Sequence, residues 1–430
     1  MAIQNLVSVL GIVVLLAIAW LLSNNRRSIR WRIVGWGLGL QFVLAVILLR
    51  TPWGQAVFGV ARSVVSRVLG FTDAGASFLW GDLYRTGPDL IENLGPGAMG
   101  PGFFQVVDSV TGDLVPLGTI FVIHIMPTII FFSSLMAILY HLGIMQRLIA
   151  GMAWLMRRTM GTSGSESLSC AANIFVGQTE APLVIRPYVQ TLTRSELMAV
   201  MVGGFATVAG GVMAAYVRFG VDAGHLMAAS VMSAPAALVV AKILFPEKEV
   251  SPTAGAVQLE IPKEYANLVD AAAGGATVGL RLAANVGAML LAFIALVAMV
   301  NYGLGWAGTS LQQIFGFVFA PLAWTMGVPW TEAATFGNLL GTKIAVNEFV
   351  GYIELMAAVN SEALSPRSAI IGTYALCGFA NFASIAIQIG GIASIAPERR
   401  SDVAKLGIKA MFGGALASWL TATIAGILTV

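Results

Sequence analysis

The chain has 430 residues, of which 57 % are hydrophobic and 10 % are charged, and its formal net charge is +3. Soluble domains carry about 25 % charged residues, so this composition, with a mean hydropathy of +0.84, excludes a soluble globular protein and indicates a polytopic membrane protein. The sequence has no basic block that would indicate nucleic-acid binding. Cys170 and Cys377 lie in apolar stretches and are interpreted as small core residues.

The spans can be predicted from length, because about 20 apolar residues cross a bilayer as a helix. Eight stretches meet this condition: 5–23, 33–49, 117–140, 195–217, 224–245, 278–301, 368–396 and 407–430. The first has no basic segment before it and no small-residue cleavage site, so we expect a retained span and not a signal peptide. The apolar stretches 163–190 and 330–360 are interrupted by Gly, Pro and charge. They are predicted to be helical hairpins that each enter and leave by one face.

Positive charge orients these spans, because Lys and Arg favour the cytoplasmic side of a membrane. With eight spans, the basic residues in or beside four loops fall on one side: Arg26, Arg27, Arg30, Arg32, Arg147, Arg157, Arg158, Arg186, Arg194, Lys242, Lys248, Lys263, Arg399, Arg400 and Lys405. Both termini then face outward, as does an acidic segment around Asp89, Glu92, Asp108 and Asp113. The first hairpin opens from the cytoplasm and the second from outside.

Three stretches, 55–70, 144–160 and 306–325, have an amphipathic helical pattern. The first is the clearest, with Val57, Val60, Val64 and Val68 on one stripe. We expect these stretches to lie at the membrane interface, although ordinary loop helices explain the pattern equally well. The segment 246–276 is the only loop of any length with a soluble composition.

Glu180 and Glu348 lie in the two predicted hairpins, where charge is expensive. A carboxylate at bilayer depth costs about 2.5–3.5 kcal/mol on insertion scales, which favours a functional role. Each hairpin is followed by a span that contains small and polar residues, at 205–210 (FATVAG) and at 379–384 (FANFAS), and each of these spans begins with Arg-Ser. Aligning the two strings predicts an inverted repeat, which is how secondary transporters build a site with alternating access.

The tip of the first hairpin combines an amide, a hydroxyl and a carboxylate, in Gln178, Thr179 and Glu180. Pro182 suits the first turn of a helix, so these three residues are expected to precede the second limb of the hairpin. Such groups bind a neutral ligand that forms hydrogen bonds. The alternative is that Glu180 pairs with a basic residue elsewhere in the fold.

In the second hairpin, Asn347 and Glu348 are expected to end the first limb. The Glu348 carboxylate can there accept a hydrogen bond from each hydroxyl of a vicinal diol. The alternative is an ion pair with Lys343, five residues earlier. Asn381 and Ser384 add polar groups on one helical face, and Phe379 either presents its ring to a flat ligand or simply packs.

A second group of oxygen atoms is predicted near the first hairpin. Asn173 carries a side-chain oxygen and Thr207 a hydroxyl, and the carbonyls of Val176 and Val208 are expected to be free where the backbone leaves a helix. Hard oxygen ligands on unwound backbone are how secondary transporters hold Na⁺.

Three motifs, at 177–183 (GQTEAPL), 347–350 (NEFV) and 378–382 (GFANF), together resemble the concentrative nucleoside transporter family, and the resemblance covers most of the chain. It implies a bacterial, sodium-coupled nucleoside symporter and not an enzyme. The implied fold is all-α and polytopic, with eight transmembrane helices, two re-entrant helical hairpins in an inverted repeat, and interfacial helices. It also implies a homotrimer and an elevator-like movement of a transport domain.

The resemblance assigns roles by position in the motifs. It implies that Gln178, Thr179 and Glu180 contact the nucleobase, which Val212 flanks, and that Glu348, Asn381 and Ser384 contact the ribose, with Phe379 beside the ligand. It implies that Asn173, Val176, Thr207 and Val208 hold Na⁺. Some members have Ser where this chain has Thr207, and the hydroxyl is kept.

The identity of the coupling ion follows from the stretch 173–180. Proton-coupled members depart from the Asn-x-x-Val-Gly-Gln-Thr-Glu pattern, and this chain keeps it. We therefore favour Na⁺, with a proton-coupled nucleoside symporter as the alternative, and we expect no organic cofactor.

The resemblance divides the chain into scaffold and transport domains. The expected units are 1–116 (spans one and two with an interfacial segment), 117–143 (scaffold span three), 144–245 (first hairpin with spans four and five), 246–276 (cytoplasmic linker), 277–325 (scaffold span six and an interfacial helix) and 326–430 (second hairpin with spans seven and eight). The expected partners are a nucleoside such as uridine, the lipid bilayer and two further copies of the chain, with no nucleic acid. The expected location is the bacterial inner (cytoplasmic) membrane, with several spans and both termini periplasmic.

Two other classes of protein are alternatives to a carrier. A membrane-embedded enzyme needs a catalytic group, but the sequence has no His-Glu-x-x-His motif, and His124, His141 and His225 lack partners at useful spacing. A channel needs a continuous path between the hairpins, and its flux does not saturate with substrate.

Overall fold

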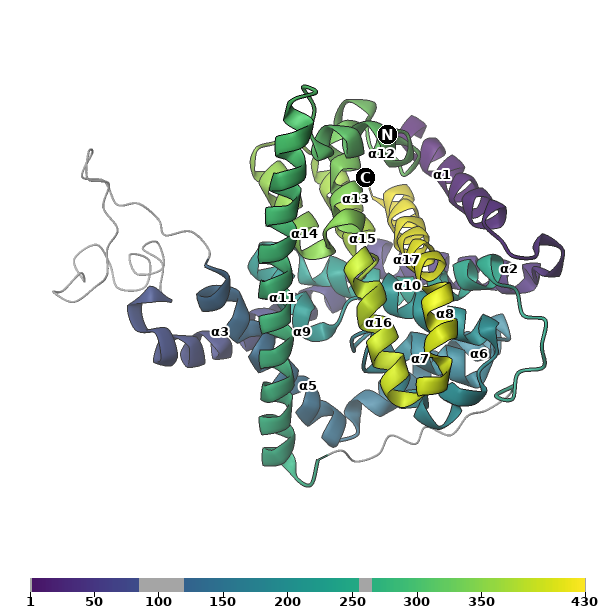
Figure 1. Cartoon of the computed structure of the whole chain (residues 1–430), viewed down its shortest axis with the longest axis horizontal. Helices are drawn as coiled ribbons and strands as arrows, with labels where there is room; N and C mark the ends of the chain where they lie inside the picture. The colour runs from purple at the N-terminus through teal and green to yellow at the C-terminus, as the bar shows by residue number, and fades with distance from the viewer. Residues whose placement is uncertain (1, 85–119, 255–264, 430) are drawn as a thin grey trace.

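The computed structural model describes residues 2–84, 120–254 and 265–429, and the regular elements in these ranges are all helices (Figure 1). The α-helices are α1 (Ala2–Leu21), α2 (Trp31–Arg50), α3 (Pro52–Trp80), α5 (Met126–His141), α6 (Ile144–Met160), α7 (Gly164–Ala172), α8 (Arg194–Ala206), α9 (Gly210–Arg218), α10 (Ala223–Leu244), α11 (Leu268–Gly305), α12 (Leu311–Thr325), α13 (Trp330–Ala345), α14 (Glu348–Asn360), α15 (Pro366–Leu376), α16 (Phe382–Ile395) and α17 (Arg400–Leu428). Short 3₁₀ turns are η1 (Arg26–Ser28), η2 (Gly81–Leu83), η4 (Ala181–Thr191) and η5 (Pro397–Arg399), and η3 (Phe121–Ile125) is a π-helix. The predicted all-α class is confirmed, whereas the predicted acidic segment (Asp89, Glu92, Asp108, Asp113) and Lys263 lie outside the described residues.

Seven helical runs in the described ranges are long and apolar enough to cross a membrane: Gln4–Leu21, Trp31–Arg50, Phe121–His141, Arg194–Arg218, Ala223–Leu244, Leu268–Gly305 and Pro397–Leu428. They coincide with seven of the eight predicted spans, so the chain is a multi-pass membrane protein. The eighth prediction, 368–396, contains two shorter helices, α15 and α16. The pair α12 and α13 is bent by 116° and forms either a broken span or a re-entrant loop. The total of eight spans therefore stays a prediction.

Each of the two stretches predicted to be a hairpin forms a pair of short helical limbs, and the re-entrant course of these pairs stays a prediction. The first consists of α7 and η4, and both of its limbs open toward one end of the molecule. At that end the Gly164 amide donates to the Thr253 carbonyl (3.0 Å), and Arg399 donates to the carbonyl of Leu192 (2.7 Å), which follows η4 directly.

The second hairpin, α13 and α14, opens toward the opposite end. Glu332, in the first turn of α13, accepts hydrogen bonds from the amide and the hydroxyl of Ser365 (both 3.1 Å). Arg367, close by, donates to the side chain of Asn5 in α1 (2.8 Å). Both chain ends lie toward this end of the molecule in Figure 1. The two hairpins therefore open toward opposite ends of the molecule, and which end faces the cytoplasm stays a prediction.

The helix that follows each hairpin is broken at an equivalent place. Helix α8 begins after the N-cap Thr193 and stops at Thr207, and α9 begins after the N-cap Ala209. In the second half, the N-caps of α15 and α16 are Ser365 and Asn381, so both pairs of caps are separated by the same number of residues. The sequence alignment of 205–210 with 379–384 is therefore wrong by two residues, because it pairs Asn381 with Thr207, a C-cap, instead of Ala209. The similarity of these two short apolar strings does not show where each helix ends.

Small residues allow the membrane helices to pack closely, which matters because lipid provides no hydrophobic drive for helix association. On α17, a Cβ at Gly414 would lie 2.2 Å from the Cβ of Phe205 in α8. On α11, Gly275 and Gly279 approach α5 so closely that a Cβ at either would come within 2.8 Å of Ser133 or Ala137 atoms. The buried side of α8, α10 and α17 thus forms the protein core, with α5 and α11 packed as a second pair.

All three predicted amphipathic stretches are helical, in α3, α6 and α12. On α3, Phe58 and Ala61 are buried, whereas Val57, Val60 and Val64 are 49, 63 and 53 % exposed. An exposed apolar row of this kind suits contact with lipid, and the interfacial position stays a prediction. The predicted linker 246–276 is too long, because α11 already begins at Leu268, where Asn267 caps the helix.

Candidate functional site

The tip of the second hairpin places Glu348 in the protein interior, 4 % exposed. The prediction that Glu348 ends the first limb is wrong: α13 ends at Ala345, and Glu348 is the first residue of α14. Asn347 is the N-cap of α14, and its side-chain oxygen accepts a hydrogen bond from the Val350 amide (2.9 Å). A carboxylate in the first turn of a helix is stabilised by the helix dipole, which favours this placement.

Two neutral donors hold the Glu348 carboxylate. The Tyr216 hydroxyl donates to Oε1 (2.8 Å), and the Asn381 amide donates to Oε2 (3.1 Å). The alternative of an ion pair with Lys343 is not found, since the described ion pairs include neither Glu348 nor Lys343. A carboxylate has about four lone-pair positions, so two donors leave acceptor capacity for further hydroxyl groups.

The break between α15 and α16 presents the predicted residues around Glu348. Gly378 has a φ of +102°, a conformation that disfavours any side chain. Asn381 is the N-cap of α16 and accepts the Ser384 amide (2.9 Å), so the two residues form a cap and not one face of a continuous helix. Phe379 lies within the break and is partly buried.

Tyr216 belongs to the site although the sequence analysis does not single it out. It lies on α9, is fully buried, and stacks on Tyr352 with ring centroids 4.4 Å apart. A tyrosine in an apolar helix gives no local signal of function, because its partner Glu348 is far away in the sequence. Only the packing of α9 against α14 reveals the contact.

The tip of the first hairpin lies against α8 and α16. A Cβ on Gly204 of α8 would meet both the amide nitrogen of Gln388 (2.6 Å) and the Cβ of Gln178 (2.9 Å). A Cβ on Gly391 of α16 would lie 3.1 Å from the Thr179 methyl carbon. The hairpin tip therefore rests on the same helix, α16, whose N-terminus holds Asn381 beside Glu348.

Glu180 is the N-cap of η4 and precedes Pro182, as predicted. Its carboxylate folds back over Gly177, where an added Cβ would lie 2.3 Å from Oε2. The described ion pairs do not include Glu180, so the alternative of a basic partner is not found. Gln178 is 7 % exposed, and its side-chain oxygen has no hydrogen-bond partner among the described residues. Val212 is buried on α9, next to the break in the helix.

The predicted oxygen group also lies at this tip. The Asn173 side-chain oxygen is buried and has no hydrogen-bond partner in the described part of the chain, while its amide donates to the Ser169 carbonyl (3.0 Å). The Thr207 hydroxyl donates to the Gly203 carbonyl (2.9 Å), which leaves its own lone pairs for another partner. The Gly210 amide donates to the Phe175 carbonyl (3.1 Å) and fixes the helix break against the hairpin.

This donor set fits a sodium ion. Val176 follows the end of α7 and Val208 follows the end of α8, in two non-helical stretches. The hydrogen bond from the Gly210 amide to the Phe175 carbonyl joins these two stretches. A buried oxygen without a donor costs free energy, about 1–3 kcal/mol, unless a cation or water approaches it. Amide, hydroxyl and backbone carbonyl oxygens are hard ligands of the type that Na⁺ takes in such transporters.

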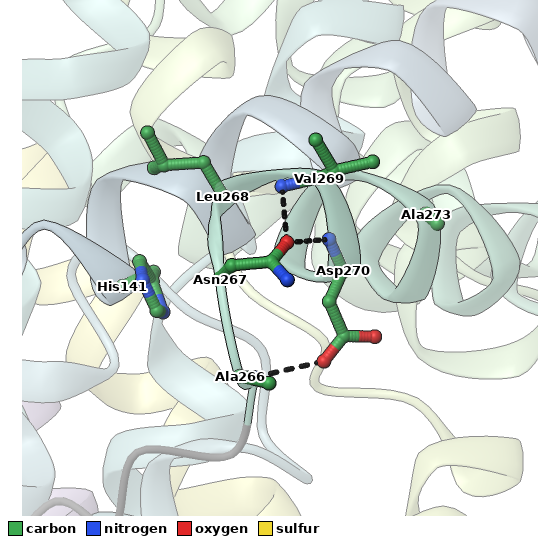
Figure 2. A pocket seen from close by; sticks show the side chains of 7 residues that line it. All are labelled: His141, Ala266, Asn267, Leu268, Val269, Asp270 and Ala273. Carbon is green, nitrogen blue, oxygen red and sulfur yellow. Dashed lines mark hydrogen bonds between the residues drawn. The ribbon is translucent and has the colours of Figure 1, made fainter.

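A hollow of about 760 Å³ lies elsewhere, at the start of α11 (Figure 2). His141 and the residues from Ala266 to Asp270 line it. Asn267 caps the N-terminus of α11, because its side-chain oxygen accepts hydrogen bonds from the amides of Val269 (3.0 Å) and Asp270 (2.9 Å). Because no residue of either hairpin tip lines this hollow, it is not part of the candidate site.

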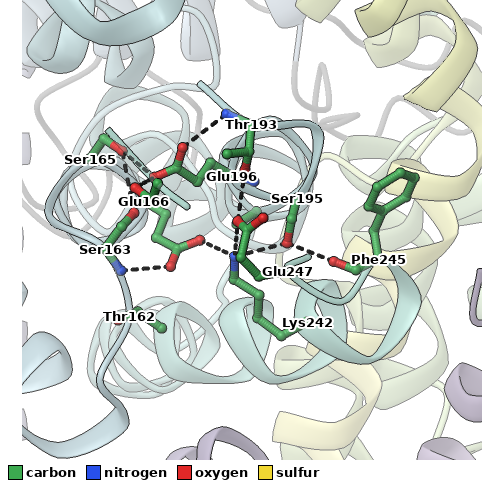
Figure 3. Close-up of polar contacts among 12 residues, drawn as sticks. Thr162, Ser163, Ser165, Glu166, Thr193, Ser195, Glu196, Lys242, Phe245 and Glu247 are labelled. Atoms are coloured by element: carbon green, nitrogen blue, oxygen red, sulfur yellow. Dashed lines mark hydrogen bonds and ion pairs between the residues drawn. The ribbon is translucent and has the colours of Figure 1, made fainter. Parts of the chain in front are cut away.

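Besides Glu348, the structure buries two glutamates that the sequence did not single out, Glu166 (2 % exposed) and Glu196 (0 %). They form a polar cluster at the base of the first hairpin (Figure 3). Lys242 lies 2.5 Å from the Glu166 carboxylate and 3.6 Å from that of Glu247, and it donates to the Ser195 hydroxyl (2.9 Å). This ion pair offsets the cost of burying the charges, and removing one partner typically costs about 3–5 kcal/mol.

A sequence signal for this polar cluster exists. Ser163 with Glu166, and Thr193 with Glu196, are capping boxes, in which the glutamate accepts the N-cap amide (2.7 and 2.9 Å). The Ser/Thr-x-x-Glu spacing marks the starts of α7 and α8. The polar cluster therefore joins α7, α8 and α10 at the base of the first hairpin, away from the tip.

Two opposed hairpins and two broken helices that meet around buried polar groups are typical of a membrane transporter. Three sequence models of protein families match successive parts of the chain. They are Na⁺ dependent nucleoside transporter N-terminus (residues 10–83), nucleoside recognition (122–223) and Na⁺ dependent nucleoside transporter C-terminus (225–426).

Individual relatives agree with these matches. An uncharacterized transporter of Haemophilus influenzae is 45 % identical over 431 residues, which cover 98 % of this chain and 97 % of the relative. Sodium/nucleoside cotransporter 1 of Mus musculus is 41 % identical over 448 residues, which cover 99 % of this chain and 64 % of that longer protein. The structure of CNTnw in an inward-facing substrate-bound state has a TM-score of 0.89 and 44 % identity, and the match covers 100 % of this chain and 98 % of that one.

The chain belongs to the Na⁺-dependent nucleoside transporter family. The resemblance seen in the sequence motifs is thereby confirmed. The family consists of transporters, so the prediction that the protein is not an enzyme is confirmed as well.

Proposed function

We propose that the protein is a symporter that takes up nucleosides, such as uridine, together with Na⁺. The observation that carries this proposal is that both hairpin tips rest on one helix, α16. Glu348 is bonded to Asn381 at the start of α16, and Gln178 lies beside Gln388 further along it. From Asn381 to Gln388 a helix rises about 10 Å, which is comparable with the length of a nucleoside.

The two tips offer the chemistry that the two ends of a nucleoside need. The Glu348 carboxylate, with Asn381 and Ser384, is suited to the ribose diol, because charge-assisted hydrogen bonds are about twice as strong as neutral ones. Gln178, Thr179 and Glu180 are suited to the donors and acceptors of the base edge. Phe379 and Val212 are proposed to flank the flat base.

Na⁺ is proposed to bind the oxygen atoms of Asn173, Val176, Thr207 and Val208. The unpartnered Asn173 oxygen supports this assignment. Binding would draw the first hairpin tip onto the break between α8 and α9, next to Val212, and would thus prepare the base end of the site. Proton coupling is the alternative, and replacing Na⁺ with choline at constant pH separates the two.

The wider context is also part of the proposal. Helix α11 exposes apolar side chains such as Leu291 (76 %) and Met299 (63 %), which suits contact with lipid or with other copies. We propose a homotrimer built on α5 and α11, with elevator-like movement of the remaining core. We place it in the bacterial inner membrane, with both termini periplasmic.

The test is uptake of radiolabelled uridine into proteoliposomes with and without an inward Na⁺ gradient. We expect saturable uptake that requires Na⁺. Uptake driven equally well by a proton gradient in choline would contradict sodium coupling, and flux that does not saturate with uridine would indicate a pore.

A further inference from the structure

Lys343 is a fully buried lysine that has no place in the proposed binding of nucleoside or sodium. It lies on α13, the first limb of the second hairpin, and is 0 % exposed. Its ammonium group donates three hydrogen bonds, to the carbonyls of Ala375 (2.8 Å) and Cys377 (2.9 Å) and to the Ser418 hydroxyl (2.7 Å). All of its hydrogens are thus used on neutral oxygens.

Those two carbonyls belong to the end of α15, at the break before α16. A helix end of this kind has carbonyls without intrahelical donors and carries about half a negative charge. In the interior of a membrane protein, such an end needs a cation or a donor. Lys343 supplies both, and it does so from the neighbouring hairpin limb.

The first half of the molecule has the same geometry without a lysine. There the last turn of α8 lies against Asn173, at the end of the first limb of the first hairpin, since a Cβ at Gly203 would come 3.4 Å from the Asn173 side-chain nitrogen. The N-caps Thr193 and Ala209 of the first half correspond to Ser365 and Asn381 of the second. If the same spacing is applied to the hairpins, Lys343 aligns within two residues of Asn173. Asn173 has an oxygen without a partner, whereas Lys343 has its own positive charge.

The third helix of each half completes the correspondence. In the second half, α17 contributes Ser418, which accepts from Lys343. In the first half, α10 contributes Ser230, which donates to the Ile174 carbonyl (3.0 Å) at the corresponding hairpin. Each hairpin is therefore joined to its broken helix and to the helix that follows.

We propose that the Lys343 ammonium is a tethered cation that occupies, in the second half, the position that Na⁺ occupies in the first. This inference rests on the proposed function. Lys343 is a positioning residue: it pins the end of α15 to the second hairpin and so holds Asn381 against Glu348 in every sodium concentration. Only the first half then depends on an ion from solution.

The experiment replaces the tether in two ways in the full-length protein and measures uridine binding by calorimetry across a range of Na⁺ concentrations. Lys343→Met removes the charge and all donors. Lys343→Asn instead adds an amide oxygen to the two carbonyls and the Ser418 hydroxyl, which recreates the oxygen set predicted for the first half. Lys409→Met is the matched control, because Lys409 also donates to a backbone carbonyl, Leu22 (2.9 Å), but outside the site.

We expect Lys343→Met to weaken uridine binding about tenfold at every Na⁺ concentration, because two carbonyls lose a charged donor. Lys343→Asn should show the same loss at low Na⁺ and recover most of it at high Na⁺, with a steeper sodium dependence than the wild type. Such rescue by an ion distinguishes a cation position from a purely structural contact. Lys409→Met should bind like the wild type.

The inference is overturned if Lys343→Met binds uridine like the wild type, or if Na⁺ rescues Lys343→Asn no better than Lys343→Met. If Lys343→Met does not yield folded protein, Ser418→Ala decides in its place. That variant keeps the lysine and removes one of its three partners, so uridine binding should weaken about threefold, and unchanged binding would overturn the inference. Wild-type protein without sodium-dependent uridine binding would instead defeat the proposed function.

Discussion

The tips of the two hairpins differ in how completely their polar groups are satisfied. At the second tip, Glu348 is buried and both of its oxygens accept hydrogen bonds from the protein. At the first tip, the side-chain oxygens of Asn173 and Gln178 are buried without partners, and Glu180 has no basic neighbour among the described ion pairs. A hydrogen-bond network whose groups are all paired is rigid. A network with unpaired buried groups is stabilised when a ligand binds and pairs them. The second tip is therefore preorganised, and the first tip is built to respond to its ligands.

The largest effect should come from the preorganised tip. Glu348→Gln keeps the shape but replaces an ionised acceptor with a neutral amide that also brings donors to face Tyr216 and Asn381. We expect uridine affinity to fall roughly 100-fold, about 3 kcal/mol, with little change in the Na⁺ requirement. Equilibrium binding with labelled uridine measures this change.

Glu354→Gln is the matched control, since Glu354 lies on the same helix and accepts from Asn338 (3.2 Å) away from the tip. It should bind uridine within about twofold of the wild type. Equal losses of uridine affinity in both variants would show that the substitutions only destabilise α14. They would contradict a direct role of Glu348 in binding uridine.

The responsive tip should show the opposite signature. Asn173→Ala or Thr207→Ala removes one oxygen from the proposed ion position. We expect the Na⁺ concentration for half-maximal uptake to rise about tenfold, while uridine affinity at saturating Na⁺ stays nearly unchanged. Thr423→Ala is the control, because its hydroxyl donates to the carbonyl four residues earlier (2.7 Å), as that of Thr207 does (2.9 Å), but on α17. Unaltered sodium dependence in both site variants would move the ion elsewhere.

A smaller effect should follow when one donor to Glu348 is removed. Tyr216→Phe keeps the ring stack and deletes the hydroxyl, so uridine affinity should fall roughly fivefold. Tyr352→Phe serves for comparison, because the Tyr352 hydroxyl donates to the Thr373 carbonyl (2.8 Å) and not to Glu348. A loss no larger in Tyr216→Phe than in Tyr352→Phe would show that the hydroxyl does not orient the carboxylate.

The smallest effect concerns the seat of the first tip on α16. In Gly391→Ala the new methyl group would lie 3.1 Å from the Thr179 methyl carbon, so Thr179 must shift by a few tenths of an ångström. We expect about a twofold loss of uridine affinity. Gly390→Ala is the adjacent control, since its Cβ would meet no atom within 4 Å. An equal change of uridine affinity in the two variants would show that the contact between the first hairpin tip and α16 does not affect binding.

Much of this architecture is predictable from the sequence, because membrane spans and their orientation depend on length, hydrophobicity and loop charge. Seven predicted spans coincide with helices, and the polar tips appear where Gly, Pro and Glu interrupt apolar stretches. The limb that carries Glu348 was assigned wrongly, because the N-cap role of Asn347 competes with a simple reading of helix ends. The roles of the predicted site residues stay proposals.

The missed contacts share one property: the two partners lie on helices that are not adjacent in the sequence. Tyr216 meets Glu348, and Lys343 meets Ala375 and Ser418, only after these helices have packed. Local patterns carry no information on such pairs. Glu166 and Glu196 differ, because their capping boxes are local and were readable in advance.

The backbone of Gly378 touches the other half of the molecule directly. A Cβ at Gly378 would lie 2.5 Å from the Phe205 carbonyl oxygen and 2.7 Å from the Ala206 carbonyl carbon, so the two helix breaks cross with nothing but main chain between them. A contact between main-chain atoms does not require particular side chains at the other positions, apart from the glycine itself. We therefore expect chimaeras that exchange one half of this chain with that of a relative to retain the crossing, provided the glycine is kept.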